Sequence, residues 1–126
     1  MEHPNLFVPG DPLLERLRRV CFRFPEVAEV EAWGRATFRA GKRIFAVAGS
    51  SMDRPYSVVF KPDPEERRAL IEDPRFFIPP YFGAAGWLGI DVDGDDTDWA
   101  ELAELLETSY RQVALKRQLA ALDAIM

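Results

Sequence analysis

The sequence has few of the residues that most often perform chemistry, because its 126 residues include one cysteine and one histidine. A single thiol cannot form an internal disulfide, so we expect a reducing compartment. His3 lies in a segment, residues 1–10, that we expect to be an N-terminal arm. An arm rarely holds an imidazole rigidly beside a catalytic partner. Cys21 falls on the apolar side of an expected helix, which favours a buried thiol over a reactive one.

Long apolar segments are also missing. No run approaches the roughly 20 residues that span a bilayer, and the first ten residues lack the basic and apolar segments of a signal peptide. We therefore expect a cytoplasmic protein with no membrane partner. The composition, 48% hydrophobic and 29% charged, is that of an ordinary globular domain. We assign residues 11–115 to one domain and residues 116–126 to a C-terminal helical extension or tail.

Motifs for catalysis, phosphate loops and metals are absent or incomplete. Gly83 and Gly86 are not followed by the lysine of a P-loop. The acidic run that starts at Asp91 places Asp96 and Leu102 where a calcium loop needs glycine and glutamate. We interpret this run as a polar turn with negative charge at a helix N-terminus. We expect no enzyme, no cofactor and no metal, although a carboxylate pair or an arginine-rich pocket would be invisible at this level.

Three segments carry helix signals. Asp11 before Pro12 combines a capping side chain with a proline suited to the first turn, and apolar residues follow at helical spacing. Residues 63–66, Asp-Pro-Glu-Glu, predict a second helix with a capping box. Asp98, with Glu101 three residues later, predicts a third.

Elsewhere the hydrophobic period is two, which is typical of strands. Such segments occur at 27–33, on both sides of a hairpin turn at 40–43, and at 56–61, 76–78 and 87–92. Helices are too few to cross over after each strand, so a parallel sheet is disfavoured. We predict an α+β fold of two layers in the order α-β-β-β-α-β-β-α. An antiparallel sheet of about five strands would carry its helices mainly on one face.

Several local strings occur in a specific order along this chain: Phe-Pro-Glu-Val at 24–27, Ala-Trp-Gly-Arg-Ala-Thr-Phe-Arg-Ala-Gly-Lys-Arg-Ile-Phe-Ala at 32–46, Phe-Lys-Pro-Asp-Pro-Glu-Glu at 60–66, Pro-Tyr-Phe-Gly at 80–83, Gly-Trp at 86–87 and Asp-Trp at 98–99. With these strings, residues 11–115 resemble the MmcQ/YjbR family. The resemblance implies a fold like that of secretion chaperones. It also implies a DNA-binding label, which in that family rests on similarity to a double-wing arrangement.

The charge is unevenly distributed, although the net value is −5. Residues 1–61 hold ten Lys and Arg against seven Asp and Glu, whereas residues 62–126 hold six against fourteen. No acid interrupts the basic hairpin 34–43, and a hairpin with several cations can contact phosphates. Arg16, Arg19 and Arg23 would widen the patch if the first helix lay beside the hairpin. The predicted nucleic-acid-binding residues are Arg35, Arg39, Lys42, Arg43 and Lys61.

Two alternatives stay open for these features. The hairpin arginines could be neutralised by Glu29 or Glu31 across the sheet. Aromatic residues near Pro79 and Pro80 could form an exposed cleft for a protein or a small ligand, or they could be core. The residues of this possible patch are Trp33, Tyr81, Phe82 and Trp87. The two leading hypotheses are therefore DNA binding through the hairpin and binding of a protein or small ligand with chaperone-like geometry. The sequence does not specify the oligomeric state.

Overall fold

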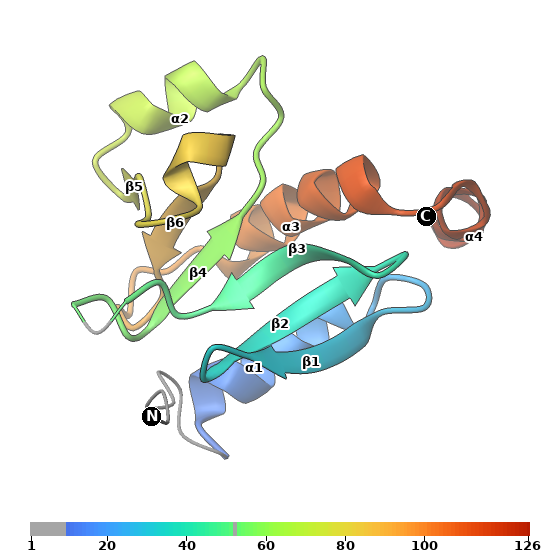
Figure 1. Ribbon diagram of the computed structural model, residues 1–126, viewed down its shortest axis with the longest axis horizontal. Helices are drawn as coiled ribbons and strands as arrows, with labels where there is room; N and C mark the ends of the chain where they lie inside the picture. Colours follow the sequence, from blue (N-terminus) through green and yellow to red (C-terminus); the bar gives the residue numbers. More distant parts are fainter. Residues whose placement is uncertain (1–9, 52) are drawn as a thin grey trace.

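A computed structural model describes residues 10–51 and 53–126, and His3 lies outside this range. An antiparallel sheet with the strand order β1-β2-β3-β4-β6-β5 runs through the molecule (Figure 1). The strands are β1 (Ala28–Ala32), β2 (Arg35–Ala40), β3 (Arg43–Ala48), β4 (Ser57–Phe60), β5 (Phe76–Phe77) and β6 (Leu88–Asp91). The helices are α1 (Pro12–Cys21), α2 (Arg67–Glu72), α3 (Trp99–Val113), α4 (Lys116–Ile125) and the short 3₁₀ turn η1 (Gly83–Ala85).

The α+β class and the antiparallel sheet are confirmed, but the expected strand count is wrong. The described sheet has six strands and not five, because the hairpin contributes two strands and four strands precede α2. The start of α2 also differs from the prediction. The Asp63 side chain accepts a hydrogen bond from the Glu65 N–H at 2.9 Å, and its carbonyl accepts from both Glu66 and Arg67. Residues 64–66 therefore form a tight turn, and the helix begins at Arg67.

The other predicted caps are confirmed. Asp11 accepts a hydrogen bond from the Leu13 N–H at 2.8 Å, and Asp98 accepts one from the Glu101 N–H at 3.0 Å. After α3 the backbone turns extended at Ala114, so α4 is a separate helix. Leu122 of α4 is fully buried in the core. Within the described part of the chain, no helix has the length and apolar character needed to cross a membrane.

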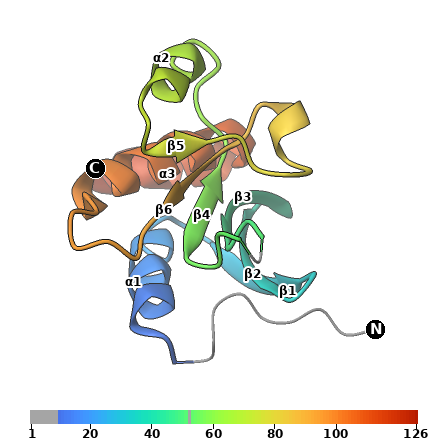
Figure 2. The same ribbon diagram turned by 90° about the vertical axis from the view of Figure 1, so that its left-hand side faces the viewer.

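One face of the sheet carries the main core, and α1 and α3 lie on this side (Figure 2). Phe38, Phe45 and Phe60 are completely buried there. The Ser109 hydroxyl of α3 donates to the Phe45 carbonyl at 2.6 Å and accepts from the Lys61 N–H at 2.9 Å. This one side chain ties α3 to two neighbouring strands beside the register shift between β2 and β3.

Cys21 of α1 is completely buried on this core side. Burial raises the pKa of its thiol well above the ordinary value, and the negative charge of Glu29 adds to the effect. A thiol held in the protonated form is a poor nucleophile. The interpretation of Cys21 as a core residue is therefore confirmed.

The opposite face of the sheet carries a second row of residues. Thr37, Val47 and Val59 are paired in register across β2, β3 and β4, and all three are fully buried although they lie outside the main core. The row continues through Gly89, where an added Cβ would lie 2.5 Å from the Phe77 ring. A side chain at this position would displace Phe77. We call this second face, opposite α1 and α3, the outer face.

Candidate binding site on the outer face of the sheet

The register of β1 and β2 separates the hairpin arginines from the nearby glutamates. Ala28 lies opposite Arg39, whereas Glu29 lies opposite Phe38. Residues directly opposite each other share a sheet face, so Arg39 lies on the outer face and Glu29 on the core side. Glu29 accepts hydrogen bonds from Arg18 of α1, with Oε1 and Oε2 each 2.7 Å from a guanidinium nitrogen. The alternative in which Glu29 neutralises the hairpin arginines is therefore wrong.

Glu31 follows the same register. It lies opposite Ala36 and therefore on the core side, away from Arg35 and Arg39. Within residues 10–51 and 53–126, every ion pair uses an arginine outside the hairpin. These arginines are Arg18, Arg54, Arg75, Arg111 and Arg117. Arg39 thus keeps its charge available on the outer face, whereas Arg43 lies opposite the core residue Ala40 and points to the other side of the hairpin.

At one end of β2 the structure brings Arg39 and Lys42 together. They line a hollow of about 350 Å³ with Glu26, which we call the basic hollow. The Glu26 carboxylate accepts a hydrogen bond from Arg117 at 3.0 Å, and this lowers the Glu26 pKa. Arg43 is exposed at the same end of the hairpin. The local charge at this end is therefore positive.

Other predicted cations do not join the basic hollow. The backbone of Lys61 is bound by Ser109 and Gln112 of α3, and Lys61 is not among the residues that line the hollow. Arg16, Arg19 and Arg23 gather beside Trp99, where α1 meets α3. Since α1 packs on the core side, these arginines do not widen the hairpin patch, and that conditional expectation is wrong.

At the other end of β2 lies a pocket of about 480 Å³ lined by Trp33, Arg35, Tyr81 and Phe82, which we call the aromatic pocket. Trp33 comes from the turn between β1 and β2, and Tyr81 and Phe82 come from the loop after β5. The Phe82 ring lies 6.3 Å from the Trp33 ring and 5.6 Å from the Trp87 ring, measured between centroids. Trp87 thus supports Phe82 from behind. The predicted aromatic residues are neighbours, and Trp33 and Tyr81 remain 54% and 89% exposed.

Both ends of β2 are closed by two-residue turns with positive φ at both positions. Trp33 and Gly34 have φ of 55° and 74°, and Gly41 and Lys42 have φ of 57° and 71°. Such turns match the twist of a hairpin and normally use Asn or Gly. A tryptophan or a lysine in the left-handed region costs roughly 1–2 kcal/mol. The sequence signal for these turns is the pair of dipeptides Trp-Gly and Gly-Lys between strands.

Backbone strain coincides with the two hollows. The described non-glycine residues with positive φ are Glu26, Trp33, Lys42 and Tyr81, and each of them lines either the basic hollow or the aromatic pocket. Strained residues of this kind persist where the surrounding fold holds them, and they cluster at binding sites. Both ends of the outer face are therefore candidates for binding.

Arg35 provides the charge in the aromatic pocket. Its Nη2 donates to the Ser50 carbonyl at 2.8 Å. Burial lowers the pKa of the guanidinium, and the nearby Tyr81 hydroxyl partly opposes this shift. An arginine stays cationic in proteins even so. Among the described residues, the buried side-chain atoms without a hydrogen-bond partner are Arg35 Nε and Ser50 Oγ.

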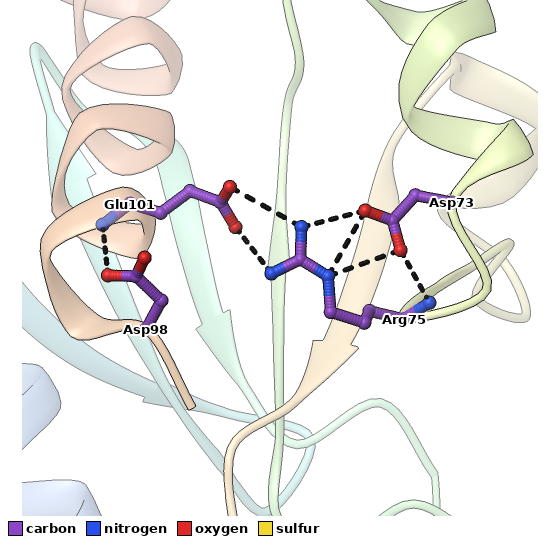
Figure 3. A network of polar contacts seen from close by, with 4 residues as sticks. All are labelled: Asp73, Arg75, Asp98 and Glu101. Atoms are coloured by element: carbon purple, nitrogen blue, oxygen red, sulfur yellow. Dashed lines mark hydrogen bonds and ion pairs between the residues drawn. The ribbon is translucent and has the colours of Figure 1, made fainter. Parts of the chain in front are cut away.

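Several carboxylates of the acidic half of the chain make contacts within the fold. Arg75 contacts Asp73 and Glu101 at 2.7 and 2.8 Å, and Asp98 caps the helix that carries Glu101 (Figure 3). The hydrogen bonds from Arg75 lower the pKa of Asp73. Asp91 pairs with Arg54 at 2.5 Å. The Arg75 contacts join the segment between α2 and β5 to α3, and the Arg54 contact joins the loop before β4 to β6, so these carboxylates have a structural role.

Comparisons with known proteins agree with this architecture. A sequence model of the YjbR family matches residues 22–112. The crystal structure of Deinococcus radiodurans protein DR2400, described as a DUF419 domain, is similar with a TM-score of 0.70 and 24% sequence identity, covering 87% of each chain. At that identity the likeness shows the fold. No curated protein matches the sequence.

Proposed function

This chain belongs to the YjbR family, and we propose that it is a non-catalytic binding module that contacts DNA through the basic end of its outer face. The observation that carries the proposal is the separation of charges by register: Arg39 and Lys42 share a hollow from which Glu29 is excluded. We also propose a cytoplasmic location, which the single buried thiol supports.

The physical basis is the attraction between unpaired cations and backbone phosphates. Phosphate binding releases condensed counterions, so affinity falls as salt rises. Glu26 does not repel phosphate strongly at the rim of the basic hollow, because Arg117 holds its carboxylate. The proposal needs no base readout, and we expect binding with little sequence preference.

The test uses a variant that removes the positive charges at the basic end and preserves the hairpin backbone. Arg39→Gln, Lys42→Asn and Arg43→Gln together remove three charges, and asparagine tolerates the positive φ of position 42. The matched control is Arg19→Gln, Arg23→Gln and Arg68→Gln, which removes three exposed charges elsewhere. DNA affinity is measured by fluorescence anisotropy from low to physiological salt.

Log K of binding falls as log salt rises, and we expect the hairpin variant to reduce the magnitude of this negative slope by about 2 to 3. The control should change the slope much less. An unaltered slope in the hairpin variant contradicts the proposal. Absence of measurable binding by the unmodified protein at low salt also contradicts it.

A second candidate function has its own observation. The loop of residues 78–87 is not fully packed inside, since Tyr81 is among the most exposed described residues and borders the aromatic pocket. A pocket with aromatic walls and one cation is typical of a small-ligand site. This end of the outer face is distinct from the basic hollow.

A further inference from the structure

We propose that the aromatic pocket binds a small planar anion the size of a mononucleotide, with its ring against the aromatic side chains and its anionic group on Arg35. This goes beyond DNA binding at the hairpin, because it uses the opposite end of β2 and different residues. The ligand can be a free nucleotide or an unpaired nucleotide of a strand, since both offer the same ring and phosphate.

One hydrogen bond orients the Arg35 guanidinium. Nη2 is anchored on the Ser50 carbonyl, and Nε is buried without a partner. Nη1 forms no hydrogen bond to another described residue, and Arg35 lines the pocket. A fixed guanidinium with unpartnered N–H groups is well suited to a carboxylate or a phosphate.

The charge of Arg35 in the pocket is not balanced by a carboxylate of the described residues. Arg35 is partly buried, and its pKa is lowered by that burial. No carboxylate of the described residues forms an ion pair with it. A partly desolvated cation without a counter-ion is unfavourable on its own. An incoming anion supplies the missing charge, so the pocket selects anionic ligands over neutral ones.

The aromatic rings of the pocket are held in a defined arrangement. Phe82 stands edge-on to Trp33 with an interplanar angle of 70°, and Trp87 packs behind Phe82. Trp33 and Tyr81 are held at φ of 55° and 67° while most of the Tyr81 side chain contacts solvent. The fold gains little from an exposed ring on a strained backbone. A ligand that stacks on these rings would give that arrangement a use.

The aromatic pocket has the volume of a small-molecule site, and its lining differs from that of the basic hollow. A volume of about 480 Å³ lies within the roughly 300–1,000 Å³ range of small-molecule sites. None of the described residues that line the basic hollow, at the other end of β2, is aromatic. Only the aromatic pocket, among the described hollows of the outer face, combines rings with a cation. It can therefore distinguish a nucleotide from a bare phosphate.

The experiment uses the full chain and three probes: deoxyadenosine monophosphate, adenosine and inorganic phosphate. Each is titrated by calorimetry into the unmodified protein and into the Arg35→Gln, Tyr81→Asn and Arg68→Gln variants. We expect saturable binding of the monophosphate and much weaker binding of the other two probes. Loss of a charged hydrogen bond in Arg35→Gln should weaken binding roughly ten- to a hundredfold. Arg68→Gln, which removes an exposed arginine on α2, should have no effect.

Tyr81→Asn keeps the test valid if Arg35→Gln disturbs the loop at Ser50. Tyr81 is 89% exposed and asparagine accepts its φ, so this variant should fold and bind at least about fivefold more weakly. The Arg39, Lys42 and Arg43 triple variant should bind the monophosphate normally, which distinguishes this site from the basic hollow. Competition by a single-stranded oligonucleotide would assign the ligand to a strand, and its absence would assign a free nucleotide.

Three results would overturn the proposal. The first is the absence of saturable binding of the monophosphate. The second is that inorganic phosphate binds as tightly as the monophosphate. The third is that the folded Arg35→Gln and Tyr81→Asn variants bind the monophosphate as tightly as the unmodified protein.

Discussion

Arg75 and Arg35 each connect two parts of the fold, but their charges meet different surroundings. Arg75 lies between Asp73 and Glu101, and these hydrogen bonds raise its pKa. Arg35 contacts one backbone carbonyl, and burial lowers its pKa. The first arginine has two counter-ions within the fold. The second has none among the described residues, and it borders an open pocket.

The same contrast holds for the two sides of the sheet. On the core side, buried polar groups are satisfied: Ser109 bridges two strands, and the Tyr110 hydroxyl donates to the Pro25 carbonyl at 2.7 Å. Near the outer face, Ser50 Oγ is buried without a partner, and strained residues line the hollows. Stability is concentrated where α1 and α3 cover the sheet. The two candidate hollows lie at the ends of β2 on the opposite face.

The largest effect on stability is expected from replacing the buried Ser109, and the buried Ser50 provides the comparison. Ser109→Ala leaves the Phe45 carbonyl and the Lys61 N–H without their partner, so we expect a loss of about 2–3 kcal/mol in the free energy of unfolding. Ser50→Ala removes a hydroxyl that donates to no described atom, and we expect a change below about 0.5 kcal/mol. Urea unfolding of both variants provides the measurement. Equal losses would show that the outer face is as well satisfied as the core.

A smaller effect of opposite sign should come from relieving strain in the aromatic pocket. Tyr81→Asn replaces an exposed ring at φ 67° with a residue that favours this region. We expect a gain of up to about 1 kcal/mol in the free energy of unfolding, together with the weaker nucleotide binding described above. Thermal unfolding measures the gain. A destabilised variant would mean that the ring supports the fold and is not held for a ligand.

The smallest effect should appear at the Arg75 junction, which is exposed. The side-chain hydrogen bond from Arg75 lowers the Asp73 pKa. A lowered pKa in the folded state stabilises the protein above the unfolded value, about 3.9, and this contribution is lost as the pH falls below it. In Arg75→Gln we expect the Asp73 pKa to return toward the ordinary value, as measured by NMR titration. An unchanged pKa would contradict the role given to Arg75.

Local signals were enough to predict part of this structure. Asp11 and Asp98 cap their helices as expected because capping depends on a few consecutive residues. The start of α2 was missed because Asp63 can close either a turn or a helix. The sheet has more strands than expected because both arms of the hairpin around 40–43 pair as separate strands between β1 and β4.

The candidate site depended on information that lies between segments. Glu29 and Arg39 are separated by the pairing register of β1 and β2, and a shift of one residue would place them on the same face. Trp33 meets Phe82 only because the loop after β5 crosses the outer face. The residues of the aromatic patch could therefore be predicted by type, whereas their assembly with Arg35 could not.

The most direct measurement is calorimetric titration of deoxyadenosine monophosphate into the unmodified protein, Arg35→Gln and Arg75→Gln under identical conditions. An uncompensated Arg35 predicts that Arg35→Gln loses at least about tenfold in affinity and that Arg75→Gln binds like the unmodified protein. Equal affinities in all three proteins would contradict the assignment of Arg35 as the cation that receives an anionic ligand.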